Sequence, residues 1–265
     1  MRKFRSIKLS DEVIKHSVVG SVAEIILSRP KHYNSFNQKL RSDLFMLLNN
    51  LEAETKIRVV ILRGSGPGFC AGADLTEPFP PPISKHLEKD YKPIFDLIVR
   101  SRYIYIASVH GSAAGIGAAL AMACDFIIMS ETAKLSMVFT NIGLVPDGGS
   151  TWFLEKALGY RKALELIVEG NSLEAKECLE YGLINKIVSE DRIENDTLKW
   201  AKKLSDRAPL ASAAAKRLLR KNPNHNFEEA FMAEALEQDA LSVSEDFASA
   251  RAAFFKKEKP FFKGK

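Results

Sequence analysis

A chain of 265 residues with 46% apolar and 27% charged residues is long enough for a large buried core and has the composition of a soluble globular protein. No apolar run approaches the roughly 18 residues that a membrane-spanning helix needs, so we expect no membrane span. The net charge of +5 fits either attraction to an anionic ligand or an ordinary solvated surface, and without a zinc-finger or RNP motif it predicts no nucleic-acid binding.

The first half of the chain alternates strand-like and helix-like segments. Its N-terminal segment is basic but lacks the apolar core of a secretory signal. Four apolar runs are predicted to be strands, over residues 23–28, 59–63, 104–109 and 126–129. A helix is predicted over 38–55, with one apolar face made by Leu40, Leu44, Leu47, Leu48 and Leu51. This alternation predicts an α/β core whose sheet is covered by helices.

A proline-rich loop over residues 78–83 interrupts this pattern. Its prolines exclude a helix through the segment, and we interpret it as a mobile cover over a binding site.

The second half of the chain is predominantly helical. Helices are predicted over residues 152–170, 173–181, 191–207 and 227–257, with ends at Gly159, Gly170, Gly182, Pro209 and Pro223. We therefore expect an α/β core over residues 1–200 and a C-terminal helical region over 201–265.

Cysteine and histidine spacing argues against metal sites and disulfides. The three cysteines, Cys70, Cys124 and Cys178, match neither a zinc spacing nor a disulfide framework, which favours a reducing, cytoplasmic location. We expect Cys70 to be a packing residue and His110 to be structural. No metal is predicted, because no ligand spacing links His16, His32, His86 and His225.

Two glycine-rich segments are candidates for binding an anionic oxygen. In GSGPGFCAGADL (residues 64–75), Gly68 and Gly72 allow the backbone to turn sharply and approach a ligand, although a tight strand-to-helix connection needs the same residues. HGSAAGIGAALAMACD (residues 110–125) leads into a helix, whose N-terminus suits an anion; close helix–strand packing is the alternative. Donors from two separate loops are typical of an oxyanion hole.

The order of these motifs resembles the crotonase (enoyl-CoA hydratase/isomerase) superfamily. FCAGADL, HGSAAGIGA, IGLVPDGG and the run from Leu158 to Val188 carry the resemblance, which extends from LSRPKHYNSFN to the C-terminal tail. It implies a crotonase-like spiral of β-β-α units with a C-terminal helical trimerisation region. It also implies an acyl-CoA thioester substrate, with coenzyme A as part of that substrate and no prosthetic group, and a homotrimer or a hexamer made of two trimers.

The resemblance also implies roles for individual positions. The backbone N–H groups of Ala73 and Ile116 match the oxyanion donors, and Asp147 matches the acid of several isomerases. Substrate contacts are implied for Ala71, Asp74, Leu75, Thr76, Gly115 and Phe139. In the tail, Phe254 and Lys257 match a coenzyme-A-contacting helix that serves a neighbouring subunit, although Lys257 also fits a solvated surface.

Two departures from the hydratase pattern point to the reaction. Ala119 and Phe139 stand where hydratases of the family carry glutamates, and neither side chain transfers a proton. Phe139 also makes that wall apolar, which disfavours an ordered water. Asp147 is then the one plausible acid–base group of the motif region, since Asp125 and Glu131 are expected to cap an element or lie in solvent.

The sequence leaves open a second role for Asp147 and the direction in which the pKa of its carboxyl is shifted. An aspartate at this place also suits the N-cap of the following helix. A wall of Phe139, Leu144 and Val145 would raise the pKa of its carboxyl, and the nearby helix start would lower it, so the sequence leaves the sign open.

We therefore predict an enoyl-CoA isomerase. Asp147 would remove a proton from C2 of a 3-enoyl-CoA and return it at C4. Within the family the motifs are most similar to the 1,2-epoxyphenylacetyl-CoA isomerase branch, which implies phenylacetate breakdown or fatty acid metabolism.

Three alternatives stay open. A hydratase would need an unrecognised partner for Asp147. A dehalogenase would use the aspartate as a nucleophile, but such members carry tryptophan where this chain has Phe139. A non-catalytic acyl-CoA-binding or RNA-binding member would need no acid there.

The tail aromatics are expected to pack between subunits: Phe227, Phe231, Phe247, Phe254 and Phe255.

Overall fold

A computed structural model describes residues 12–79, 81–221 and 225–265 of the chain. Three features of the sequence lie outside the described residues: the basic segment 1–11, Pro80 of the proline-rich loop, and Pro223, where a helix end is predicted. No helix of the described part is long and apolar enough to cross a membrane.

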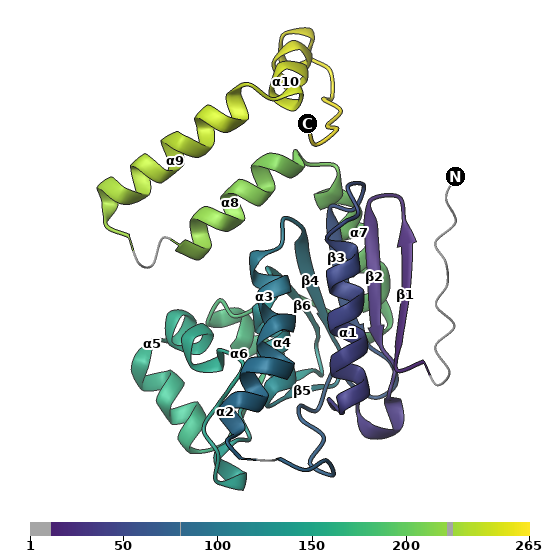
Figure 1. Cartoon of the computed structure of the whole chain (residues 1–265), viewed down its shortest axis with the longest axis vertical. Coiled ribbons are helices and arrows are strands. Elements are labelled where there is room, and N and C mark those ends of the chain that lie inside the picture. The colour runs from purple at the N-terminus through teal and green to yellow at the C-terminus, as the bar shows by residue number, and fades with distance from the viewer. Residues whose placement is uncertain (1–11, 80, 222–224) are drawn as a thin grey trace.

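A six-stranded sheet forms the centre of the molecule (Figure 1). Its order is β1-β2-β3-β4-β6-β9, and every pairing is parallel except that between β1 and β2. The strands are β1 (Ile14–Val19), β2 (Val22–Leu27), β3 (Val59–Gly64), β4 (Ile104–Val109), β6 (Phe126–Ser130) and β9 (Lys186–Val188). All four predicted strands are therefore confirmed, and β1 and β9 are additional edge strands.

Both faces of the central strands of this sheet are buried. On one face lie α1 (Gln38–Leu51), α3 (Lys92–Arg100) and α4 (Ile116–Ala123), and α7 (Ile193–Ser205) covers the other. Alternate residues of one strand join different clusters: Val60 packs on the α1 side and Ile61 on the α7 side. Such strands have no polar face, which explains why they are continuous apolar runs in the sequence.

Helix α1 follows its predicted pattern but is shorter. Asn37 caps it by accepting a hydrogen bond from the backbone N–H of Leu40. Leu40, Leu44, Leu48 and Leu51 are buried, and the helix ends at Leu51 rather than at Thr55.

A second, smaller sheet completes a spiral of strand pairs. It consists of β5 (Ser112–Ala114), β7 (Lys134–Ser136) and β8 (Ser172–Glu174), in the order β5-β7-β8. Strand β4 is followed by β5 and then α4, and β6 is followed by β7 and then α5 (Ser150–Val168), so each unit gives one strand to each sheet. This arrangement confirms the expected β-β-α fold.

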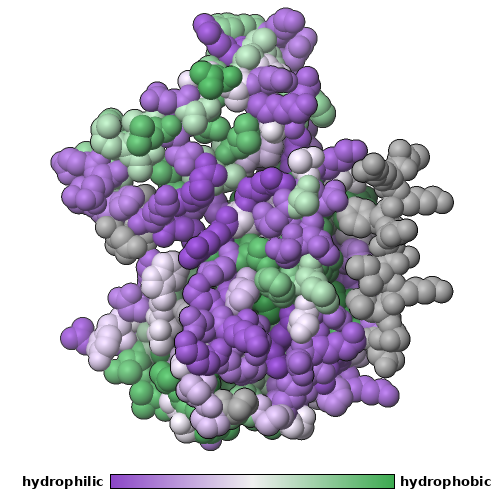
Figure 2. Space-filling view, in the orientation of Figure 1, coloured by the Kyte–Doolittle hydropathy of each residue, from purple (hydrophilic) through white to green (hydrophobic). Residues whose placement is uncertain are grey.

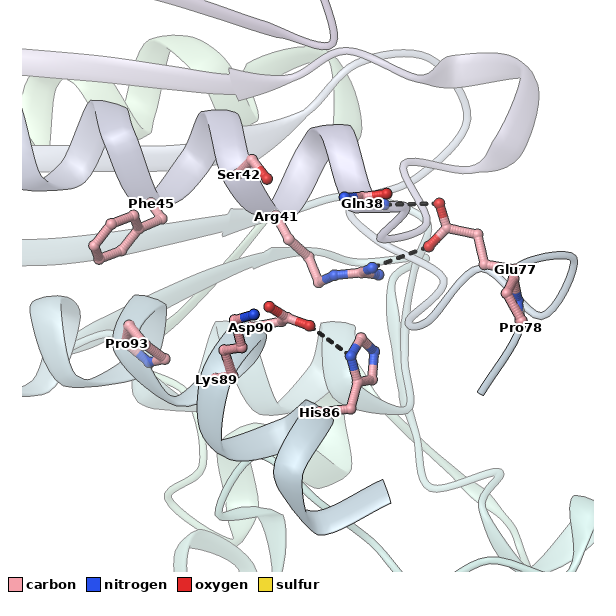
Figure 3. A pocket seen from close by; sticks show the side chains of 10 residues that line it. All are labelled: Gln38, Arg41, Ser42, Phe45, Glu77, Pro78, His86, Lys89, Asp90 and Pro93. Carbon is pink, nitrogen blue, oxygen red and sulfur yellow. Dashed lines mark hydrogen bonds and ion pairs between the residues drawn. The ribbon is translucent and has the colours of Figure 1, made fainter. Parts of the chain in front are cut away.

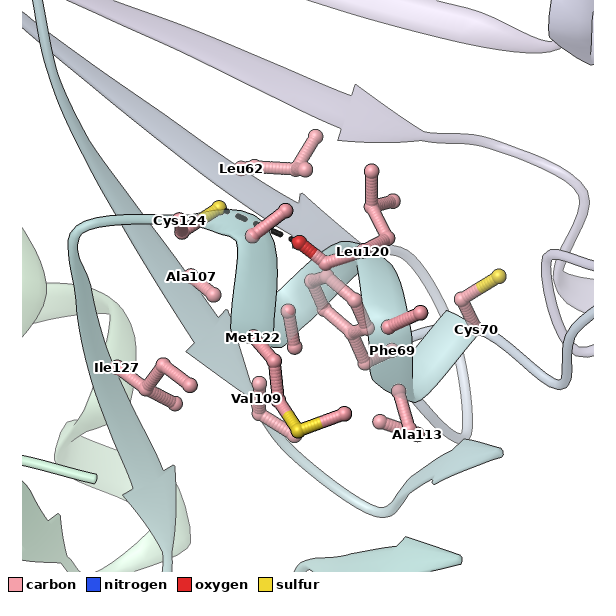
Figure 4. Close-up of a cluster of buried hydrophobic side chains, with 14 of the residues drawn as sticks. Leu62, Phe69, Cys70, Ala107, Val109, Ala113, Leu120, Met122, Cys124 and Ile127 are labelled. Carbon is pink, nitrogen blue, oxygen red and sulfur yellow. Dashed lines mark hydrogen bonds between the residues drawn. The ribbon is translucent and has the colours of Figure 1, made fainter. Parts of the chain in front are cut away.

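Helix α4 is buried along its whole length, because its side chains are small or apolar (Figure 4). A Cβ atom on Gly117 would lie 2.3 Å from the carbonyl oxygen of Cys70, so only glycine allows this approach. Burial raises the pKa of the Cys70 thiol to about 12, and the thiol donates to the carbonyl of Asn34. This environment favours the expected packing role of Cys70 over a nucleophilic one.

The C-terminal region differs from the prediction in two places. The single helix expected over 227–257 is two helices, α9 (Phe227–Ser242) and α10 (Glu245–Lys256), because Ser244 caps the second. Pro209 starts a helix, α8 (Pro209–Lys221), instead of ending one; the first turn of a helix tolerates proline because its N–H groups have no intrahelical partner.

The other predicted helices are confirmed with shifted ends. Helix α5 contains a break at Gly159, and α6 (Ala175–Glu180) begins directly after β8. Short helices cover Pro30–His32, Ile83–His86 (α2), Thr140–Ile142 and Glu190–Arg192, and a π-helix covers Leu87–Tyr91. Helices α9 and α10 extend away from the sheets, with hydrophobic surface visible along them (Figures 1 and 2). The division into units 1–200 and 201–265 stays a prediction.

A buried cation fastens α8 to the core. The ammonium group of Lys216, whose side chain is only 4% exposed, donates to the carbonyl oxygens of Ile98 and Tyr103 and to the carboxylate of Asp125. Arg220 also pairs with Asp125, whose carboxylate in addition accepts a hydrogen bond from the backbone N–H of Tyr105 in β4. Asp125 is therefore the centre of an ion-pair network that the sequence pattern did not predict, instead of a helix cap or a solvated residue.

Lys216→Met is expected to lower the free energy of unfolding by about 3 kcal/mol, because it leaves two buried carbonyls without this donor and leaves Asp125 with Arg220 alone. Lys199→Met is the matched control, since Lys199 is 76% exposed in its pair with Asp196 and should cost less than about 1 kcal/mol. Urea unfolding of both variants measures the difference. Equal losses would contradict this role of Lys216.

Candidate active site around Asp147

A cavity of about 330 Å³, which we call the Asp147 cavity, lies where the glycine-rich segments, α2 and the loop before α5 meet. Most of its lining is apolar. It is formed by Ala71, Gly72, Ala73, Leu75, Phe79, Ile83, His86, Leu87, Tyr91, Gly115, Ile116, Val138, Phe139, Ile142, Leu144 and Asp147. Among the described residues that line it, Asp147 alone carries a carboxylate.

The backbone N–H group of Ala73 points away from Phe36, the residue with which Ala73 forms a β-bridge. Ala73 forms a parallel bridge with Phe36, in which Phe36 N–H donates to Gly72 at 2.7 Å and Asp74 N–H donates to Phe36 at 3.1 Å. In an extended chain the N–H groups of successive residues point to opposite sides. The Ala73 N–H therefore points away from Phe36, and it donates no hydrogen bond within the described residues.

A second N–H group without a partner lies close to this segment. Ile116 is the first residue of α4, so its N–H has no intrahelical acceptor, and it donates to no other described residue. A Cβ atom on Gly72 would lie 3.5 Å from Ile116 N and 2.8 Å from the carbonyl oxygen of Ala114. Gly72, with φ of +95°, thus lets the two segments meet, and Ala73 and Ile116 line one cavity.

Asp147 does not have the capping role that its position also suggested. The N-cap of α5 is Gly149, which makes no side-chain cap, and Asp147 contributes only its backbone carbonyl to Ser150. Its Oδ1 atom is buried and has no hydrogen-bond partner in the described part of the chain. Burial raises the pKa of this carboxyl to about 6, which decides the sign that the sequence left open.

The apolar wall near this carboxyl is smaller than predicted. Phe139 and Leu144 line the cavity as expected, whereas Val145 is 74% exposed and is not part of the lining. Burial of the carboxyl itself is the main cause of its raised pKa.

The two positions that carry glutamates in hydratases supply no acid. Ala119 is fully buried in α4. Its Cβ atom lies close to Gly148, the residue after Asp147, since a Cβ atom added to Gly148 would be 2.7 Å from it. Phe139 places its ring beside Gly115, 3.8 Å from a Cβ built there. The cavity therefore combines one buried carboxylate with two backbone donors, an arrangement that can move a proton beside a developing negative charge.

Some predicted substrate-contacting residues lie elsewhere. Ala71, Leu75 and Gly115 line the cavity, but Asp74 and Thr76 do not. The Thr76 hydroxyl donates to Asp74 at 2.7 Å and Arg29 pairs with it at 2.9 Å, and these contacts lower the pKa of Asp74 to about 2. This network fixes the chain next to Ala73, so its observable role is in positioning.

The two tail residues are also remote from the cavity. Phe254, on α10, is 78% exposed, and Lys257 ends that helix in a left-handed conformation. Neither lines the Asp147 cavity. Their contact with a nucleotide stays a prediction about an assembled protein.

One wall of the cavity comes from the segment 77–91, which the resemblance marks as the specificity loop but for which no individual residue was predicted. Ile83 and His86 of α2, and Leu87 and Tyr91 of the following π-helix, line it together. The sequence offers no motif for this segment beyond its proline-rich loop, which contributes Phe79. Burial raises the pKa of the Tyr91 phenol to about 12, even though Arg41 donates a hydrogen bond to its oxygen.

A family model described as enoyl-CoA hydratase/isomerase matches residues 18–265. The chain is 31% identical to 1,2-epoxyphenylacetyl-CoA isomerase of Escherichia coli over 96% of this chain and 99% of that protein. It is 30% identical to 2,3-dehydroadipyl-CoA hydratase of the same organism, over 91% and 94%. The crystal structure of an enoyl-CoA hydratase from Bacillus anthracis is similar with a TM-score of 0.91 at 29% identity, covering 96% of this chain and 100% of that one.

The raised pKa of Asp147 predicts a pH-dependent stability difference. The folded carboxyl binds its proton up to a pH of about 6, so ionised Asp147 destabilises the fold above that pH, and the cost disappears as the pH falls below about 4. Asp147→Asn should therefore be more stable than the wild type by about 2 to 3 kcal/mol at pH 7.5 and by about half of that at pH 5. Urea unfolding at both pH values measures this.

Asp206→Asn is the control for this measurement. Asp206 is exposed and its pKa is lowered by a hydrogen bond from Lys259, so the variant should gain nothing at pH 7.5. An Asp147→Asn gain that does not change with pH would mean that the buried carboxyl titrates normally.

Proposed function

The chain belongs to the enoyl-CoA hydratase/isomerase family, and on that premise we propose that it isomerises the double bond of an enoyl-CoA thioester. The observation that carries this proposal is that Asp147, with its Oδ1 buried, is the one carboxylate among the described residues that line the cavity, while Ala119 and Phe139 stand where the hydratase pattern has its two acids. Moving a proton requires one such group, whereas adding water requires a second to position and activate the water.

The two backbone donors supply the charge stabilisation in this proposal. The thioester oxygen accepts hydrogen bonds from the N–H groups of Ala73 and Ile116. As the proton leaves C2, negative charge grows on that oxygen, and fixed donors stabilise it most at that stage. Ile116 also begins α4, whose N-terminal dipole end favours an anion.

Asp147 is the base in this proposal. Its pKa of about 6 leaves it mostly ionised at neutral pH, yet makes it a stronger base than an ordinary carboxylate. It takes the proton from C2 of a 3-enoyl-CoA, and protonation of the resulting dienolate at C4 gives the conjugated 2-enoyl-CoA. Coenzyme A enters as part of the substrate, and no prosthetic group takes part.

The identity of the acyl group on the substrate is a further part of this proposal. The similarity to 1,2-epoxyphenylacetyl-CoA isomerase supports a ring epoxide as a second candidate substrate, in phenylacetate breakdown rather than in fatty acid metabolism. The cavity lining, with Phe79, Phe139 and Leu144, accepts an apolar acyl group of either kind. A cytoplasmic location stays a prediction; the three free, buried thiols are consistent with it.

Hydration is the alternative reaction. It is favoured by relatives whose names include 2,3-dehydroadipyl-CoA hydratase. It would need a second group placed to activate the water, and the positions of Ala119 and Phe139 supply none. The dehalogenase and the non-catalytic acyl-CoA-binding or RNA-binding alternatives receive no support from the relatives compared above.

We also propose that the tail aromatics lie between subunits of a homotrimer or of a hexamer. In the single chain Phe227, Phe231 and Phe254 are 75%, 58% and 78% exposed. Figure 2 shows hydrophobic surface along the same helices. Large apolar side chains gathered in one region mark a contact surface.

Asp147→Asn is expected to lower the rate of 3-hexenoyl-CoA isomerisation at least about 100-fold while leaving the binding of a saturated acyl-CoA nearly unchanged. Wild-type kcat/KM should rise with pH through about 6, because the base must be ionised. The growth of absorbance of the conjugated thioester measures the rate, with crotonyl-CoA assayed beside it.

Asp206→Asn serves as the control and should keep the wild-type rate, since its carboxylate is exposed beside Lys259. An Asp147→Asn variant that keeps most of the wild-type rate would overturn the proposed base. Loss of the crotonyl-CoA signal would show hydration instead.

The oligomer is tested by light scattering. At micromolar concentration we expect the mass of three or six chains, and Phe231→Asp should shift it toward that of one chain. The exposed substitution Glu228→Lys on the same helix is the control for added charge alone. A wild-type monomer would contradict the proposed subunit contact.

A further inference from the structure

His86 stands between two cavities of different character. The second, which we call the Arg41 cavity, has a volume of about 410 Å³ and is bordered by charged groups that include Arg41, Glu77, Lys89 and Asp90. Of the described residues, His86 alone lines both this cavity and the Asp147 cavity. The residue therefore borders both a cavity with charged groups and the mostly apolar cavity that contains Asp147.

The ring of His86 is fixed from three sides. Its Nδ1 lies 2.6 Å from the carboxylate of Asp90, one helical turn further along the chain. Its faces and edges meet the rings of Phe79 and Tyr91, with centroids 6.3 Å and 5.4 Å away. In Figure 3 the ring lies between Asp90 and the segment that carries Glu77 and Pro78.

These contacts leave one ring nitrogen available. A carboxylate can only accept from Nδ1–H, so Asp90 fixes the proton on that nitrogen. The other nitrogen, Nε2, makes no hydrogen bond within the described residues. His86 itself lines the Asp147 cavity, so this unengaged ring nitrogen belongs to a side chain of that cavity, whereas Asp90 borders only the Arg41 cavity.

The other polar groups nearby are committed elsewhere. Arg41 pairs with Glu77 at 3.0 Å and donates to the Tyr91 oxygen. The phenol of Tyr91, with its pKa raised to about 12, is a weak acid. Besides the Asp147 carboxylate, the His86 imidazole is thus the side chain of the Asp147 cavity that can both accept and donate a proton.

We infer that His86, held by Asp90, is a second acid–base residue of the Asp147 cavity and supplies the proton at C4. This inference rests on the proposed isomerisation and assigns its second proton transfer to a different group. Asp147 would then serve C2 alone.

The proton balance of the two steps closes. Asp147 accepts the C2 proton, and the C2–H electron pair enters the dienolate. When both ring nitrogens of His86 carry a proton, Nδ1–H keeps its hydrogen bond to the Asp90 carboxylate. The Nε2–H bond breaks as the C4–H bond forms. The electrons of the dienolate then give the C2=C3 double bond and the thioester carbonyl. Asp147 then loses its proton and His86 regains one; Asp90, 36% exposed in the Arg41 cavity, gives the dyad access to solvent for this exchange.

His86→Asn tests the inference, because an asparagine amide can still donate to Asp90 while it removes the transferable proton. In D2O the variant should still exchange the C2 hydrogens of 3-hexenoyl-CoA, yet form conjugated product at least about 100-fold more slowly than the wild type. Asp90→Asn only loosens the hold on the His86 ring, so it should slow product formation less than His86→Asn does. Exchange of the C2 hydrogens should again be retained. His16→Asn, on exposed strand β1, is the matched control and should match the wild type in both measurements.

A second measurement follows the label itself. Substrate deuterated at both C2 positions should give wild-type product with one deuterium, because the hydrogen added at C4 comes from His86. Transfer of the C2 deuterium to C4 would overturn the inference. So would a His86→Asn variant that isomerises at the wild-type rate, or one that loses exchange and isomerisation equally.

Failure of the proposed function looks different. If the protein is not an isomerase of this type, the wild type itself neither exchanges C2 hydrogens nor forms conjugated product. If only the inference fails, wild-type exchange and isomerisation both remain.

Discussion

The candidate site depends on the close approach of two backbones, the Cys70–Ala73 segment and the first turn of α4. Glycine at 72 and 117 allows this approach, because a Cβ at either place would clash with a backbone oxygen. The bridge between Phe36 and Ala73 then turns one N–H toward the gap, and the helix start leaves a second one there. The two donors are therefore held by the packing of the core and need no side chain, so they are in place before a substrate arrives.

Asp147 differs from two other carboxylates that are largely removed from water. Asp74 is paired with Arg29, and Asp125 with Lys216, as is usual for charges removed from water. The Oδ1 atom of Asp147 has no partner among the described residues, and burial raises the pKa of the group. A desolvated carboxylate without a cation beside it costs stability, so its presence in a cavity with two free donors is more readily explained by chemistry than by folding.

The fold does not decide the reaction. Relatives of about 30% identity have isomerase and hydratase names, and a hydratase has nearly the same chain path. At this site Asp147 can carry a proton, whereas Ala119 and Phe139 cannot. The α2 segment adds His86 to the same cavity, so the second half of the chemistry is set by an element outside the family motifs quoted from this sequence.

The sequence by itself determined the central strands, the apolar face of α1 and, through the resemblance, the placement of Ala73, Ile116 and Asp147 at one site. These follow from local patterns, since a strand buried on both faces is apolar at every position. It did not determine the three-residue strands of the small sheet, which are too short to show a period, or the start of α8 at Pro209. The pKa of Asp147, the Lys216 network and the cavity wall with His86 were decided only by the tertiary structure. Each depends on burial and on contacts between residues distant in the sequence, which no local pattern contains.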